Sequence, residues 1–360
     1  MKIYKAAIIG LGPSGLAVNK LIYNNIDNNI IAFEKTSIEN RNNFFGFWLT
    51  DWMMPFESLI EKKWDNWELG NTNIKIIHED KKFPYCVISY KTWREFCLNT
   101  KNKLEIKNKK VIRYEQINNY FKIITEDRKE YFVEKIYDSR SDIEKNNQLI
   151  QHFFGLNIKT ADKKFDEKKV TLMHFTEDEN VIHFIYVLPF RNNKALVEST
   201  VFSTEVLNEE WYRKKIYDYL KDFGISEFNE ISSEKGAIPM FFSEIKNSPN
   251  PNVYNIGIRG GACKPSTGYA FSFLIKQIQF LKNTNKNNVQ VHPFIEKQMD
   301  RIFLNYLKKN NENGISFINL AKKLNGYEFQ TFMMGQSSFL TKLKIISSMP
   351  KIPFLRSIFK

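Results

Sequence analysis

Short apolar runs separated by polar turns dominate the first sixty residues and predict alternating strands and helices. Residues 3–9 form a mostly apolar run that suits a buried parallel strand. Residues 16–22 have helical character, and residues 29–35 read as a second strand that carries an acid near its end. This order predicts a β-α-β unit at the start of an α/β fold of the Rossmann type.

The turn between the first strand and the helix has the spacing G-x-G-x-x-G, from Gly10 through Gly12 to Gly15. Gly10 permits the tight turn, Gly12 lets the backbone approach a pyrophosphate, and Gly15 lets helix and strand pack closely. The helix N-terminus supplies free N–H groups and a positive dipole end for phosphates. Glu34 lies 19 residues after Gly15, near the ~20 expected for a carboxylate that binds a ribose. Together these residues predict a dinucleotide-binding site.

Two later turns are further candidates for cofactor contacts. Strand-like runs over residues 119–125 and 131–137 lead into Asp138-Ser139-Arg140, and ligands of such sheets bind beyond the carboxyl ends of strands. Residues 252–258 lead into a second glycine turn and a helix, with Gly260, Gly261 and Thr267 in the turn. The alternatives are a solvated polar turn at Asp138 and a simple strand-to-helix connection at Gly260.

Residues 181–203 hold two runs rich in β-branched and aromatic residues around a polar turn, which predicts a β-hairpin. Such a sheet can wall an apolar pocket. Glu198 is a single carboxyl among apolar neighbours in the second run. Strand alternation points it either into the pocket or out to water, and the pattern leaves both open.

Composition bounds the function without specifying it. The length of 360 residues suits one large domain or two interleaved ones. The net charge of +13 favours an anionic surface as partner, although abundant Lys, Asn and Ile throughout the chain explain it equally well. No nucleic-acid-binding module is recognised, so no nucleic-acid partner is expected. Three widely spaced cysteines predict neither a disulfide framework nor a metal site, and the N-terminus has no secretory pattern. We therefore expect a cytoplasmic protein without a bound metal.

With Pro13 and Ser14, the first glycine motif resembles that of FAD-binding oxidoreductases more than that of NAD dehydrogenases. Segments along almost the whole chain together resemble the lycopene cyclases, the flavoproteins that form carotenoid rings. The matching segments are Gly10 to Gly15 with Glu34, residues 83–90, Asp138-Ser139-Arg140, residues 151–155, 184–189, 197–200 and 236–240, residues 260–269 and residues 348–355. The sequence departs from the family pattern at two positions. Ser141 replaces a glycine after the Asp138 turn, and Ser199 stands where a second acid often follows Glu198.

The resemblance implies a Rossmann-like FAD-binding fold with an inserted β-rich substrate domain and a helical C-terminal segment. We place the FAD-binding region at residues 1–140 and 251–285, the substrate region at 141–250, and the helical region at 286–360. Arg140, Gly260, Gly261 and Thr267 join the first glycine motif as expected FAD contacts. Reduced FAD is expected as the active form, with NADPH or NADH as reductant.

The implied reaction is a redox-neutral, acid-catalysed cyclisation of the ends of linear lycopene, with β rings as the expected product. The resemblance makes Glu198 the general acid, with Asp138 next in line. Because lycopene dissolves in bilayers and no apolar run is long enough to span one, we expect peripheral binding to the inner face of the membrane. The basic and apolar segment 337–360 is the candidate membrane-binding element, with packing onto the protein core as the alternative.

Two other functions share this N-terminal motif. An FAD-dependent monooxygenase or dehydrogenase acting on an apolar isoprenoid would oxidise its substrate and consume NAD(P)H, whereas a cyclase would not. A flavoprotein that binds carotenoid without catalysis would leave the pigment unchanged.

Overall fold

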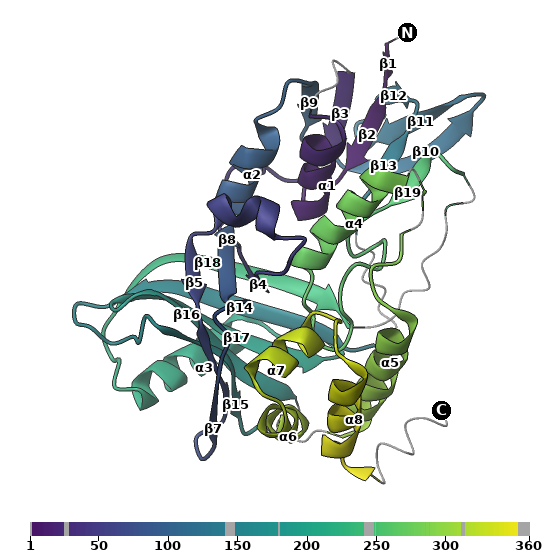
Figure 1. Ribbon diagram of the computed structural model, residues 1–360. Coiled ribbons are helices and arrows are strands. Elements are labelled where there is room, and N and C mark those ends of the chain that lie inside the picture. The colour runs from purple at the N-terminus through teal and green to yellow at the C-terminus, as the bar shows by residue number, and fades with distance from the viewer. Residues whose placement is uncertain are drawn as a thin grey trace.

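The computed structural model describes residues 2–24, 29–140, 148–178, 181–240, 248, 250–284, 286–287, 289–310 and 314–351. Ser141 and residues 352–360 lie outside these ranges. The fold is α/β, with a parallel five-stranded sheet at one end, a large mixed sheet below it and a helical C-terminal part beside that large sheet (Figure 1).

The predicted β-α-β unit forms the centre of a parallel five-stranded sheet. Its strands in spatial order are β19 (Val253–Asn255), β13 (Ile136–Asp138), β2 (Ala6–Ile9), β3 (Asn29–Phe33) and β9 (Lys103–Lys107). Apolar residues of β2 and β3 point alternately to two faces, and both faces are covered. One face packs on α1 (Pro13–Ala17), which continues as η1 (Val18–Ile22), on α2 (Tyr90–Leu98) and on α4 (Phe271–Thr284). Segments far apart in sequence thus share one sheet.

The other face of this sheet packs on a smaller four-stranded sheet. Its strands in spatial order are β1 (Ile3–Tyr4), β12 (Glu130–Val133), β11 (Tyr120–Thr125) and β10 (Val111–Ile117). Alternation along β11 sends Phe121 and Ile123 into the shared core. This layer supports β13, which ends at Asp138.

A seven-stranded sheet forms the second layer of the molecule (Figure 1). Its strands in spatial order are β18 (Asn229–Pro239), β14 (Ile150–Lys159), β17 (Lys194–Ser203), β16 (Ile182–Arg191), β15 (Lys169–Thr176), β6 (Asn66–Gly70) and β7 (Lys75–Glu79). The predicted hairpin over residues 181–203 is confirmed as the antiparallel pair β16–β17. The strands β6 and β7 lie within residues 1–140, the first part of the expected FAD-binding region. They belong to the large sheet, because β6 pairs with β15 and β7 pairs with β6.

The two faces of this sheet have different covers. One face packs on α3 (Glu209–Asp222). The opposite face packs on a three-stranded sheet and on helices from the C-terminal part, around a core rich in aromatic residues. The three-stranded sheet contains β4 (Phe44–Trp48), β8 (Tyr85–Ser89) and β5 (Lys62–Trp64), and η2 (Met54–Leu59) lies between β4 and β5 in sequence. The helices are α5 (Phe294–Lys309), α6 (Ile315–Lys323), α7 (Gly326–Met333) and α8 (Phe339–Ser348).

Candidate active site

The first glycine turn has the geometry of a pyrophosphate-binding loop. Gly10 has a φ of +91°, which favours glycine. A Cβ at Gly15 would overlap the carbonyl oxygen of Gly10, whereas a Cβ at Gly12 would meet no protein atom within 4 Å. Pro13 and Ser14 begin α1 directly after this turn. The turn therefore leaves open space only where a phosphate group is expected.

Glu34 lies beside the same turn, just beyond the end of β3. Its carboxylate accepts a hydrogen bond of 2.9 Å from the Leu11 N–H and pairs with the Arg41 guanidinium at 3.1 Å. This places an acidic side chain next to the glycine turn, where a ribose-binding acid belongs.

Asp138 is fully buried at the end of β13, between the glycine turn and β19. Its two oxygens accept hydrogen bonds from Arg140 at 2.9 and 2.7 Å, and the Arg259 guanidinium lies 3.6 Å away. Charge-assisted contacts with these two arginines therefore fix the position of the carboxylate. The Ser139 hydroxyl donates a hydrogen bond of 2.9 Å to the carbonyl oxygen of Ile9, which ties the turn to β2 of the parallel five-stranded sheet.

The second glycine loop lies against the first. A Cβ at Gly257 would come within 2.6 Å of the Ser14 hydroxyl oxygen. Gln277 of α4 accepts a hydrogen bond from the Gly257 N–H and donates one to the Gly260 carbonyl, both at 2.7 Å. Gly261 has a φ of +71°, so the chain turns sharply after Gly260.

The end of this loop carries unsatisfied polar groups. The hydroxyl oxygen of Thr267 and the amide oxygen of Gln151 are buried without a hydrogen-bond partner among the described residues. A Cβ at Gly268, which has a φ of +70°, would overlap that amide. Buried polar groups are rarely left unpaired in proteins, so a bound ligand is the natural partner here. Together the two loops fit a dinucleotide cofactor.

Glu198 lies on β17 with only 7% of its surface exposed. Leu196 and Phe202, on the same face of β17, belong to the aromatic-rich core, so the Glu198 side chain points into that core and away from solvent. The Thr200 hydroxyl donates a hydrogen bond of 2.6 Å to its carboxyl group. Burial raises the pKa of Glu198 to about 7, despite the opposing effect of this hydrogen bond. Its cross-strand neighbour on β16 is Tyr186.

The structure places a second acid beside Glu198, one that sequence reasoning did not select. Glu234 of β18 is also 7% exposed, and its carboxyl accepts a hydrogen bond of 2.9 Å from the Phe44 N–H. Burial, reinforced by the charge of Glu198, raises the pKa of Glu234 well above its ordinary value. In the sequence this residue stands in a polar stretch, residues 230–235, which carries no recognisable signal.

Ser199, where a second acid was expected from the family pattern, faces the other way. Its hydroxyl lies 2.8 Å from His183 Nε2, on the face of the sheet that packs on α3. An acid at this position would point away from Glu198 because successive residues of a strand alternate between faces.

Three tyrosines surround the acids on the Glu198 face. The Tyr85 hydroxyl lies 2.9 Å from that of Tyr186 and 3.4 Å from that of Tyr269. Burial raises the pKa of each well above its ordinary value, so all three stay neutral. Trp48 packs on Tyr85 and Tyr269, with ring centroids 4.8 and 5.1 Å away. Because Tyr269 directly follows the second glycine loop, the acids and the expected cofactor site are neighbours.

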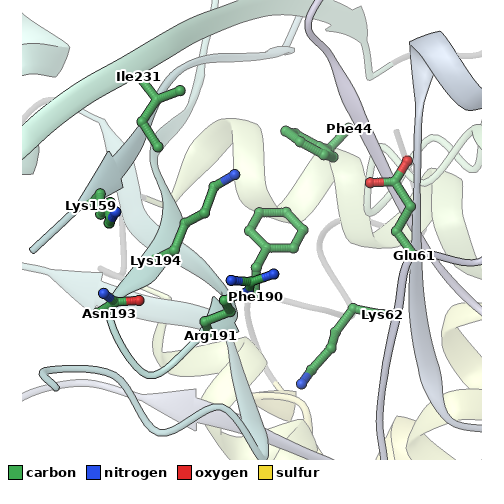
Figure 2. Close-up of a pocket in the computed structure, with 9 residues that line it drawn as sticks. All are labelled: Phe44, Glu61, Lys62, Lys159, Phe190, Arg191, Asn193, Lys194 and Ile231. Atoms are coloured by element: carbon green, nitrogen blue, oxygen red, sulfur yellow. The ribbon is translucent and has the colours of Figure 1, made fainter.

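A pocket of about 520 Å³ opens on the same face of the large sheet. Lys159 lies four residues along β14 from Gly155, and Lys194 lies four residues along β17 from Glu198. Both lysines therefore share the face of Glu198, at roughly 13 Å along the strands. Figure 2 shows the pocket with the Phe190 ring near its centre. Its lining combines apolar and cationic side chains with one acid, and comprises Phe44, Phe190, Ile231, Lys62, Lys159, Arg191, Lys194, Asn193 and Glu61. Phe44 lines this pocket and its N–H binds Glu234, so the pocket adjoins the two acids.

The C-terminal segment is partly anchored. Ile345 of α8 and Met349, which directly follows that helix, are buried against the aromatic core, whereas Phe339 and Leu340 are 74% and 70% exposed. An ion pair of 2.9 Å between Lys342 and Glu296 binds α8 to α5. Within the described ranges, no helix is both long and apolar enough to span a membrane.

Comparisons with known proteins bear on the family and the fold of this chain. The family model described as "Lycopene cyclase protein" matches residues 6–359. "Neoxanthin synthase, chloroplastic" from Solanum tuberosum is 24% identical over 296 residues, covering 74% of this chain and 57% of that protein. The Solanum lycopersicum protein of the same name gives the same figures. The chain thus spans little more than half the length of the curated relatives it matches.

Solved structures share the fold at low sequence identity. A geranylgeranyl bacteriochlorophyll reductase-like protein from Thermoplasma acidophilum matches with a TM-score of 0.65 and 14% identity, over 100% of this chain and 99% of that one. Klebsiella pneumoniae HpxO, complexed with FAD and uric acid, matches with a TM-score of 0.62 and 12% identity, over 92% of this chain and 96% of that one.

Proposed function

Because this chain belongs to the lycopene cyclase family, we propose that it is an FAD-dependent enzyme that cyclises the ends of linear lycopene, with β rings as product. The observation that carries the proposal is Glu198, a carboxyl buried under neutral aromatic side chains next to a dinucleotide-binding loop. A carboxyl in that setting keeps its proton near neutral pH and can act as an acid.

The proposed reaction begins when Glu198 protonates the terminal double bond of lycopene. A tertiary carbocation forms, the next double bond attacks it, and a six-membered ring closes. A proton then leaves, so nothing is oxidised or reduced overall. Trp48, Tyr85 and Tyr269 would offer ring faces that stabilise a nearby cation, and the burial of Trp48 and Tyr85 keeps water away from it.

FAD is the proposed cofactor, with NADPH or NADH as the reductant. Gly10, Gly12 and Gly15 would hold its pyrophosphate, Glu34 its ribose, and the loop with Gly260, Gly261 and Thr267 its flavin ring. Bound in reduced form, the flavin supplies negative charge that stabilises a carbocation. Arg140 binds both oxygens of Asp138 and Arg259 lies 3.6 Å away, so our proposal gives the acid role to Glu198 rather than to Asp138.

The direct test is expression in cells that accumulate lycopene, followed by chromatography of the pigments. We expect cyclised carotenoid with no gain of oxygen and no loss of hydrogen. An oxidised product with stoichiometric NAD(P)H consumption would replace the proposal with a monooxygenase or dehydrogenase. Unchanged lycopene that remains bound to the protein would leave a carotenoid-binding role.

The pocket beside Phe44 is the proposed path for the rest of the polyene. Ile231 is half exposed on its rim, and a larger side chain there fits without disturbing the core. Ile231→Trp is expected to lower kcat/KM for lycopene about tenfold, because it narrows the pocket, while flavin absorbance stays unchanged. Steady-state assays with lycopene in detergent or liposomes measure this effect. Ile117→Trp, at an exposed position of β10, is the control. Equal activity of both variants would remove the pocket from the substrate path.

Membrane binding is proposed for the exposed side of α8. Phe339 and Leu340 project into solvent together with the exposed Leu343 and Ile346, and this apolar surface suits a bilayer interface. Lys342 and Lys344 lie on the same helix and are paired with Glu296 and Glu328. The double variant Phe339→Gln/Leu340→Gln is expected to weaken binding to anionic liposomes at least tenfold with little loss of stability, because both side chains are exposed. Liposome co-sedimentation measures this change.

The matched control is Ile77→Gln/Ile112→Gln, which removes two exposed apolar side chains elsewhere on the molecule. This control is expected to bind liposomes like the wild type. If both double variants bind as tightly as the wild type, α8 is not the membrane-binding element.

A further inference from the structure

We infer that Glu234 is a second catalytic carboxyl that shares one exchangeable proton with Glu198, a role that rests on the proposed cyclase function. The pair would return to its starting state after each ring closure, with one carboxyl donating the proton and the other available to recover it.

The sheet register brings the two acids together. Gly155 of β14 is directly opposite Glu198 on β17 and directly opposite Glu234 on β18. Residues opposite one another in neighbouring strands point to the same face, so both carboxyls leave the sheet on the side of Tyr85, Tyr186 and Tyr269. β14 is the central strand of the three.

Gly155 provides the space in which the side chains approach each other. A Cβ at this position would lie 3.3 Å from Glu234 Cγ and 3.4 Å from Glu198 Cβ. Both acids therefore border the same small volume above β14, and any side chain at residue 155 would occupy it.

Charge balance then favours one shared proton. Each carboxyl receives one hydrogen bond, from the Thr200 hydroxyl and from the Phe44 N–H respectively. The other titratable groups that act on the pair are the three tyrosines, which burial keeps neutral. Among the residues that the structure describes, no cation pairs with either carboxyl to compensate two negative charges. Two buried carboxylates this close do not both ionise near neutrality, and they titrate as a pair.

A pair with one proton balances the whole reaction. The carboxyl O–H bond breaks as a C–H bond forms at the terminal alkene. The π electrons of the next alkene form the ring C–C bond. A neighbouring C–H bond then breaks, its electrons form the ring double bond, and the proton returns to the pair. The pair is most negative while the carbocation exists, which stabilises the intermediate electrostatically.

The test is Glu234→Gln, which keeps an acceptor for the Phe44 N–H but removes the second acid. We expect kcat to fall at least tenfold with flavin binding retained. We also expect the alkaline limb of the kcat profile to move to lower pH, because Glu198 loses the like charge that helps it keep its proton. Glu230→Gln, on the same strand and paired with Arg213, is the control and should behave like the wild type.

A measurement on the wild type guards against a variant that fails to fold. Infrared spectroscopy of the wild type at neutral pH should show the C=O band of a protonated, buried carboxyl, and the band should disappear at alkaline pH. Absence of that band at neutral pH would mean that both acids are ionised and would overturn the pair. So would a Glu234→Gln enzyme with full activity and an unchanged pH limb.

These outcomes are separate from the failure of the proposed function. A wild type that does not cyclise lycopene refutes the cyclase itself. A wild type that does, together with a fully active Glu234→Gln variant, refutes only the shared proton.

Discussion

Replacing Glu198 by glutamine is expected to lower cyclisation by roughly 10²–10⁴-fold, the range that a general acid contributes. The amide is nearly isosteric with the carboxyl and still accepts the Thr200 hydrogen bond, so fold and flavin binding should persist. Pigment chromatography measures the loss, and flavin absorbance confirms the folded state. In the wild type, kcat should fall as the pH rises through about 7, because the proton donor is lost as Glu198 ionises.

Ser199→Ala is the matched control on the same strand. Its hydroxyl binds His183 on the opposite face of the sheet, so this change should leave cyclisation close to the wild-type rate. Near-normal activity of Glu198→Gln would move the acid role to another group. A larger loss in Ser199→Ala than in Glu198→Gln would contradict the proposal, because it would place the reaction on the face of the sheet that packs on α3.

Gly12→Val is expected to abolish FAD binding without unfolding the protein. No protein atom lies within 4 Å of a Cβ at this position, so the fold tolerates the side chain. The valine would instead fill the space through which the backbone approaches the pyrophosphate. Titration with FAD, followed by absorbance or fluorescence, should show saturable binding for the wild type and none for the variant. Circular dichroism and the thermal midpoint should be similar for both.

Gly15→Ala provides the contrast within the same motif. Here a Cβ would overlap the Gly10 carbonyl oxygen, so this smaller change should lower the thermal midpoint as well as FAD affinity. If Gly12→Val binds FAD as the wild type does, the glycine turn is not a pyrophosphate site.

The sequence alone determined the elements whose cause is local. The glycine spacing from Gly10 to Gly15, the apolar runs that flank it and the acid at Glu34 follow from what a tight turn, a helix N-terminus and a buried strand require. The hairpin over residues 181–203 was equally readable, because β-branched and aromatic residues surround a polar turn. Glu198 was selected as the acid from the family resemblance, although its direction was left open by the pattern.

The tertiary structure decided what depends on neighbours distant in sequence. Glu198 points inward because its strand is covered on both faces, which periodicity in one strand does not reveal. Residues 66–79 joined the large sheet by pairing with β15, a choice that strand pairing makes and local sequence does not. Glu234 became a candidate only because β18 and β17 flank the same glycine of β14. A carboxyl in a polar stretch looks solvated until the fold buries it beside a second acid, and that burial changes its chemistry.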